Sequence, residues 1–176
     1  MRIIKLAIIS FIFLFLVVTG ISLLIPSHVR ISKAINIHTV ADSVWSQLDD
    51  LRKWESWNPF FHNLATKQVT DLDTAGGKLN AVKVETTTIK WKEKKTDEHI
   101  AEMLSANRLP LMSGWKCISH NATASNAETD SITLQWYMDF RLRWYPWEKF
   151  SSLMLENSYG IKMEQGLTNL KAILEK

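Results

Sequence analysis

The sequence predicts an α+β fold, in which one domain with an antiparallel sheet and a long C-terminal helix follows an N-terminal apolar helix. Three observations lead to this class. Residues 6–25 carry no charged side chain. Residues 132–144 alternate apolar and polar side chains, as in a strand that is buried on one face only. Residues 147–175 contain no proline and place apolar side chains at helical spacing.

The first helix is long enough to cross a lipid bilayer. At about 1.5 Å per residue, a helix over Leu6–Ile25 reaches about 30 Å, the thickness of the hydrocarbon core. We therefore expect a membrane anchor over residues 1–26, with a transmembrane helix at about residues 4–25. A single folded domain would then occupy residues 27–176.

A cleaved signal peptide is the alternative interpretation, with Arg2 and Lys5 as its charged start. No small-x-small cleavage signal follows, and the apolar run continues up to Pro26, which favours an uncleaved span. Arg30 and Lys33 lie close to the other flank, so the charge difference between the flanks is slight. We expect a single-pass membrane protein of a bacterium, with its domain on the periplasmic face.

The remaining length suits one domain with a real core and is too short for two ordinary ones. Of the 21 Lys and Arg residues, Arg2 and Lys5 precede the domain, which leaves 19 against 18 Asp and Glu. This near balance gives no reason to expect nucleic acid as a partner. Cys117 is the one cysteine, so an internal disulfide cannot form.

The first elements of the domain follow from a change of period. Side chains alternate over residues 29–38, as in a strand with one buried face. Thr39 offers an N-cap for a short helix that ends near Asp49, and a second helical turn covers Leu51–Trp54. Pro59 restricts the residue before it, so this turn ends ahead of the proline.

Four more strands are expected, over residues 65–72, 78–92, 96–104 and 114–122. In the last strand, the apolar side chains all point one way: Ile132, Leu134, Trp136, Met138, Phe140, Leu142 and Trp144. The stripe of the closing helix should face this sheet: Leu153, Met163, Leu167, Leu170 and Leu174. Gly160 and Gly166 should lie where the helix backbone approaches other groups or leaves space for a ligand.

Both ends of residues 28–175 carry segments that point to a known family. They are Ile31-Ser-Lys-Ala-Ile-Asn-Ile37, Val44-Trp45, Asp50-Leu-Arg-Lys-Trp-Glu-Ser-Trp-Asn-Pro-Phe60, Trp136 to Phe140, and Tyr159-Gly160 through Glu164-Gln-Gly-Leu-Thr-Asn-Leu-Lys171. With these segments the chain resembles the SRPBCC superfamily, the START-like, polyketide cyclase-related helix-grip domains. An apolar helix ending in Ile-Pro-Ser before the first strand is similar to membrane-anchored bacterial members.

The resemblance implies a helix-grip fold, in which a curved antiparallel sheet wraps around the C-terminal helix and encloses an apolar cavity. The composition agrees, because eight tryptophans supply more large apolar surface than a domain of this size needs. We expect the ligand-binding residues among the following: Trp57, Phe60, Trp115, Trp136, Met138, Phe140, Tyr159 and Met163.

The sequence holds no established catalytic or metal-binding motif. The five histidines are scattered, and neither a metal-ligand spacing nor a nucleotide-binding loop is present. We therefore expect no metal and no cofactor. His62, Glu156 and Tyr159 are the candidates for a single catalytic acid or base.

The sequence predicts a non-enzymatic, membrane-tethered domain whose partner is a small hydrophobic ligand or lipid. A cyclase or aromatase that folds a reactive substrate in the same cavity is the alternative from another class. A third reading is an adaptor with a vestigial pocket, which would show a filled cavity and a large exposed apolar patch.

Overall fold

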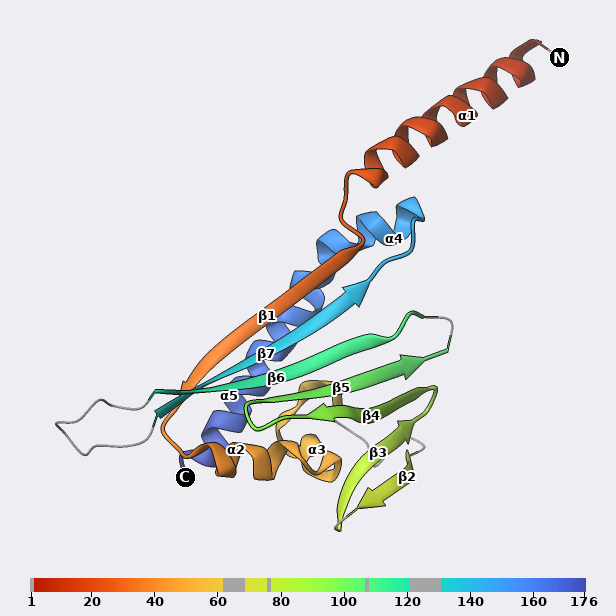
Figure 1. The fold of residues 1–176 in the computed structure, drawn as a ribbon. Coiled ribbons are helices and arrows are strands. Elements are labelled where there is room, and N and C mark those ends of the chain that lie inside the picture. The colour runs from red at the N-terminus through yellow and green to blue at the C-terminus, as the bar shows by residue number, and fades with distance from the viewer. Residues whose placement is uncertain (1, 62–68, 76, 107, 121–130) are drawn as a thin grey trace.

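The computed structural model describes residues 2–61, 69–75, 77–106, 108–120 and 131–176. Its centre is a seven-stranded antiparallel sheet in the order β1-β7-β6-β5-β4-β3-β2, shown in Figure 1. The strands are β1 (His28–Ile37), β2 (Val69–Ala75), β3 (Lys78–Val84), β4 (Thr87–Lys94), β5 (Glu98–Ser105), β6 (Leu111–His120) and β7 (Ser131–Arg141). From β2 to β7, each strand therefore pairs with the next strand in the chain, and β7 also pairs with β1.

The helices are α1 (Arg2–Leu23), α2 (Ala41–Leu48), α3 (Trp54–Trp57), α4 (Pro146–Ser151) and α5 (Ile161–Leu174). Short turns lie at η1 (Leu51–Lys53), η2 (Pro59–Phe61), η4 (Ser152–Met154) and η5 (Glu156–Gly160), the last of π type. In Figure 1, α5 runs behind β1, β7 and β6, with α2 and α3 beside its lower end. The sheet therefore grips the closing helix, as the helix-grip prediction requires.

Among the described residues, α1 is the one helix that is long and apolar enough to cross a membrane. By length and composition it can serve as an anchor or as a signal sequence. It extends away from the domain in Figure 1, with its side chains exposed along most of its length.

The first half of the domain confirms the predicted strand and the two short helical segments. The helix α2 begins one residue later than expected: Val40 is its N-cap and makes no side-chain hydrogen bond there, so the Thr39 cap was wrong. Residues 78–92 form two strands instead of one. Glu85 turns the chain between them with a φ of 53°, although it is not a glycine.

The inward face of β7 is as predicted over most of its length. Leu134 and Trp136 are fully buried, but the strand ends at Arg141, and Trp144 beyond it is exposed. Tyr137, which alternates with these residues and so points to the opposite face of the strand, is buried as well. Its ring lies over Gly114, where a Cβ atom would overlap it, and its hydroxyl donates to Glu98 at 2.8 Å.

The closing helix is broken where the sequence predicts continuity. Met163, Leu167 and Leu170 are buried as expected, and Leu174 is half-buried. Leu153, however, is 68% exposed, so its place on the inward stripe was wrong. The π turn η5 widens the helix by one residue per turn, which rotates every earlier position out of phase with α5.

A cluster of tryptophans fills the core between α3, α5 and the sheet. Trp54 and Trp115 pack edge to face with ring centroids 4.8 Å apart, and Trp115 stacks on Trp136 at 5.6 Å. Trp54 donates its ring N–H to the Leu48 carbonyl, and Trp136 donates to Ser113 Oγ, both at 2.8 Å. Trp54 and Trp136 thus combine large apolar burial with a satisfied donor, whereas the buried ring nitrogens of Trp57 and Trp115 have no hydrogen-bond partner among the described residues.

Candidate functional site

An apolar cavity of about 270 Å³ lies between the sheet and the closing helical segments. Residues from five strands, the turns η2 and η5 and two strand connections line it: Phe60, Phe61, Val84, Glu85, Thr87, Ile89, Met103, Ser105, Arg108, Leu109, Leu111, Met138 and Tyr159. Strands β3 to β7 supply one wall. The turns η2 and η5 supply the opposite wall, which is how two irregular segments come to shape the site.

The wall opposite the sheet is aromatic. The rings of Phe60 and Tyr159 stack with centroids 5.6 Å apart, and Phe140 meets Tyr159 edge-on at 4.8 Å. Asn58 positions Phe60, because its side-chain oxygen accepts the Phe60 backbone N–H at 3.0 Å. Tyr159 comes from η5, so the same π turn that shifts the helix phase brings this side chain to the cavity.

Apart from Tyr159, the polar side chains of the lining lie on β4, β5 and the connections beside them. Thr87 Oγ1 and Ser105 Oγ lie 3.4 Å apart, and the exposed Glu85 and Arg108 stand nearby on the β3–β4 and β5–β6 connections. An apolar interior with a few hydroxyls and two opposite charges suits a mostly hydrophobic molecule that carries a small polar end.

One lining residue of the cavity, Leu109, lies beside the connection from α1 to β1. Leu109 lines the cavity and also a shallow depression formed with Ser27, His28, Arg141 and Leu142. Ser27 and His28 lie four and five residues after Leu23, the last residue of α1.

The structure brings three of the eight expected ligand residues to this cavity: Phe60, Met138 and Tyr159. Phe140 lies behind Tyr159 and contacts it. The other four are fully buried in the core and do not line the cavity: Trp57, Trp115, Trp136 and Met163. Large aromatic rings at the centre of a close-packed sheet fill space instead of leaving it.

The structure describes two of the three catalytic candidates, Glu156 and Tyr159. His62 lies outside the described residues. Glu156 is exposed and forms an ion pair with Lys33 at 2.8 Å, so its carboxylate is engaged at the surface. Of the two described candidates, Tyr159 lines the cavity and Glu156 does not, and the ring neighbours of Tyr159 in the described structure are Phe60 and Phe140.

Sequence reasoning missed most of the lining from the middle strands, including Ile89, Met103 and Leu111. A signal was present in β5, where Ala101, Met103 and Ser105 alternate with outward residues. It was weak because the strand mixes small, polar and apolar side chains on both faces.

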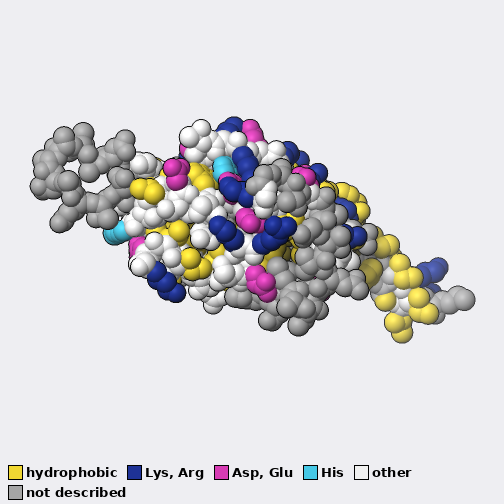
Figure 2. Space-filling view, turned by 90° about the horizontal axis from the view of Figure 1, so that it is seen from below, with side chains coloured by type: hydrophobic (Ala, Val, Ile, Leu, Met, Phe, Trp, Pro, Cys, Tyr) yellow, Lys and Arg dark blue, Asp and Glu magenta, His cyan; other side chains and the backbone are white. Residues whose placement is uncertain are grey.

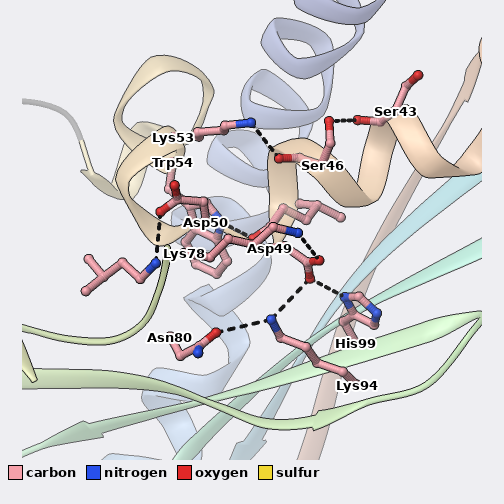
Figure 3. Close-up of polar contacts among 12 residues, drawn as sticks. Ser43, Ser46, Asp49, Asp50, Lys53, Trp54, Lys78, Asn80, Lys94 and His99 are labelled. Carbon is pink, nitrogen blue, oxygen red and sulfur yellow. Dashed lines mark hydrogen bonds and ion pairs between the residues drawn. The ribbon is translucent and has the colours of Figure 1, made fainter. Parts of the chain in front are cut away.

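A separate polar cluster joins α2 to β3, β4 and β5 (Figure 3). The Asp49 carboxylate lies 3.0 Å from Lys78 Nζ, 3.2 Å from Lys94 Nζ and 3.2 Å from His99 Nδ1. The His99 ring also stacks on Trp45, with centroids 3.9 Å apart. These contacts attach the C-terminal end of α2 to the sheet.

Charge and burial set the protonation of this cluster. Burial alone would raise the pKa of Asp49, but hydrogen bonds from Lys78 and Lys94 outweigh it and lower that pKa. Burial lowers the pKa of His99, although the Asp49 carboxylate opposes the shift. The described residues contain no group of three His, Cys, Asp or Glu side chains that could hold a metal ion.

Fold and cavity together define a helix-grip domain with an internal apolar site. Residues 28–175 match the model of the family described as polyketide cyclase / dehydrase and lipid transport, and the chain belongs to this family. No curated protein matches the chain.

Solved structures with the same fold differ widely in sequence. The Zhui aromatase/cyclase of Streptomyces sp. R1128 is 15% identical, with a TM-score of 0.59 over 84% of this chain and 94% of that one. A norcoclaurine synthase of Thalictrum is 10% identical, with a TM-score of 0.56 over 85% and 97%. A hypothetical protein of Helicobacter pylori is 11% identical, with a TM-score of 0.55 over 83% and 88%. At these identities the likeness concerns the fold alone.

Proposed function

We propose that this chain is a membrane-tethered, non-catalytic domain that binds a small hydrophobic molecule or lipid in the cavity beside Tyr159. The observation that carries this proposal is the cavity itself, with its aromatic wall and its few polar groups. The family description, which includes lipid transport, agrees with it. Phe60, Met138 and Tyr159 are the expected ligand contacts.

Native mass spectrometry of the full chain, purified in detergent, tests the proposal directly. We expect a co-purifying apolar molecule, or else a thermal shift with members of a panel of fatty acids, phospholipids and aromatic polyketides. Persistent absence of both results would count heavily against a binding function.

A matched pair of variants ties that binding to the cavity. Met103→Trp adds an indole ring inside the cavity lining, whereas Leu104→Trp adds the same ring at the next residue, which points to the other face of β5. We expect Met103→Trp to lose the bound molecule and Leu104→Trp to keep it. Equal retention by both variants would place the ligand elsewhere.

A cyclase or aromatase is the second candidate, and one observation favours it: the Tyr159 hydroxyl belongs to a residue that lines the cavity. In that case Tyr159→Phe would abolish turnover of a polyketide substrate while the variant still binds it. Unchanged turnover in Tyr159→Phe would exclude this residue as the acid or base. The adaptor reading requires a filled cavity, and the open cavity weighs against it.

The tether is proposed to be α1, retained in the inner membrane of a bacterium with the domain in the periplasm. The exposed apolar surface of α1 supports this arrangement. A reporter fused after Lys176 should be active only as a periplasmic enzyme, and cytoplasmic activity would refute the orientation. The mass of the membrane-extracted chain should include residues 1–25, whereas a cleaved signal peptide would remove them.

A further inference from the structure

An exposed apolar surface covers α4 and the turn that follows it. Trp144 is 60% exposed, Trp147 63%, Leu153 68% and Met154 66%, and Phe150 is exposed as well. We call these five residues the α4 surface. Soluble domains seldom expose so many large apolar side chains within one short segment, and such a patch marks an interaction site.

This segment buries polar side chains and exposes apolar ones, which is the reverse of the usual pattern. Pro146, Lys149 and Ser152 are buried, and their spacing of three residues places them on one helical face. Trp147 and Phe150 point away from the domain. A helix that serves only a soluble core buries its apolar stripe. Packing within the domain therefore gives no reason for the outward apolar stripe of α4.

The α4 surface begins where the apolar surface of α1 ends. Helix α4 contacts α1 and lies next to its lower end in Figure 1. Within α1, the side chains that are at least partly buried are Val18, Thr19 and Ser22, all near its C-terminal end. Lys149 fixes the junction, because its ammonium group donates to the Ile25 carbonyl at 2.7 Å and to Ser27 Oγ at 2.6 Å.

The residue types fit the boundary between lipid and water. Tyr145 contacts the Trp144 ring at 5.0 Å and stacks on the Trp147 ring at 4.8 Å, so three amphipathic rings form a continuous group. Trp and Tyr are enriched at the level of lipid headgroups. Arg141 and Arg143, both exposed, flank the group and offer charge to lipid phosphates.

The opposite end of the domain has another character. Seen from below in Figure 2, Lys, Arg, Asp, Glu and His side chains are interspersed over the domain, while yellow hydrophobic side chains cover the projecting helix at the right. That mixed-charge face suits water, and it lies away from α1.

We propose that the α4 surface lies in the interfacial layer of the bilayer that α1 crosses, so that the domain is docked on the membrane instead of swinging from a tether. The occupant of the surface is lipid, and not a second copy of the chain, because the surface is continuous with the lipid-facing side of α1 and carries interfacial aromatic rings. The inference rests on the proposed tether and adds a second contact with the membrane.

Spin labels on the full chain in vesicles of phosphatidylethanolamine and phosphatidylglycerol test the proposal. The variants Trp147→Cys and Leu153→Cys report on the α4 surface, Leu16→Cys reports on the span, and Glu55→Cys on α3 reports on water. All four positions are exposed, so labelling removes no core contact, and the native Cys117 is buried. Collision rates with oxygen and with a water-soluble nickel chelate give the depth of each label.

We expect the labels at Trp147 and Leu153 to lose nickel collisions relative to Glu55 and to gain oxygen collisions, as at Leu16. Labels at both positions that behave like Glu55, with Leu16 in lipid, would overturn the docking and leave the tether intact. Protection from both reagents would mean that protein covers the surface, which also overturns the proposal. A water-exposed Leu16 would refute the tether and the docking together.

Discussion

Two glycines of the closing helix should respond in opposite ways when each is replaced by alanine. Both have helical neighbours, and Gly160 has a φ of −58° and a ψ of −45°, which alanine adopts without strain. Alanine is favoured over glycine inside a helix by about 1 kcal/mol, and this gain is common to both variants. The contacts of the added methyl group decide the difference.

At Gly166 the methyl group would meet rigid neighbours. Its Cβ atom would lie 2.9 Å from Trp136 Cζ3 and 3.1 Å from Pro59 Cδ, and the Trp136 ring is fully buried. At Gly160 the nearest atom would be Glu156 Oε1, at 2.7 Å. That oxygen ends a flexible, exposed side chain, so it can move aside.

The expected difference follows from the cost of overpacking. Inserting a methyl group into a close-packed site costs about 1–3 kcal/mol. Moving Glu156 disturbs only an exposed ion pair with Lys33, which is worth about 0–1 kcal/mol. Gly166→Ala should therefore be less stable than Gly160→Ala, and for a chain of 176 residues each kcal/mol shifts Tm by about 2–4 °C.

Thermal unfolding of the full chain in detergent, monitored by far-ultraviolet circular dichroism, measures this difference in Tm. We expect Gly160→Ala to melt at or above the unmodified chain and Gly166→Ala to melt lowest. A Gly166→Ala variant that matches or exceeds Gly160→Ala would show that α5 does not press on the sheet at this point. The reasoning about tight packing in the closing helix would then be wrong.

Three further predictions concern the core, the polar cluster and the thiol. Leu167→Ala should cost about 2–5 kcal/mol, because Leu167 is 1% exposed, whereas Leu153→Ala should change stability by less than about 0.5 kcal/mol in the same melting assay. The pKa of His99 in the folded chain is lowered from 6.5. The contribution of the neutral His99 side chain to folding stability is therefore fully present above pH 6.5 and is lost as the pH falls through the folded-state pKa. His99→Gln should flatten this decrease of Tm with falling pH, and an unchanged pH profile would contradict it. Burial raises the pKa of Cys117 to about 11, so iodoacetamide at pH 8 should alkylate the thiol only in the unfolded chain, and rapid native alkylation would refute its burial.

The strands that sequence predicted best are those with an uninterrupted period. The period-two pattern fixes the inward side of β7, and the structure confirms it from Ile132 to Met138. The β3–β4 turn escaped prediction because Glu85 adopts a left-handed conformation that sequence reasoning assigns to glycine or asparagine. The segment Glu85-Thr-Thr contains no glycine or asparagine that would indicate a turn.

The cavity was harder to predict than the fold, for two physical reasons. A π turn changes the phase of a helix without a change in composition, so the inward place of Tyr159 and the outward place of Leu153 are tertiary properties. In addition, core and cavity recruit the same residue types. Trp136 and Met138 both point inward from β7, yet only Met138 borders empty space.

The proposed docking of α4 would bring the cavity close to the membrane, because the lining residue Leu109 lies beside the connection from α1 to β1. Leu109 lines the cavity and the depression beside Ser27, while Lys149 ties α4 to the same connection. An apolar molecule that leaves a bilayer loses about 25 cal/mol of transfer free energy for each Å² of apolar surface that water then covers. A domain docked through α4 would hold its rim near the lipid and shorten that exposure, whereas a domain that swings freely would not. The docking of α4 therefore matters most for ligands that are themselves drawn from the membrane.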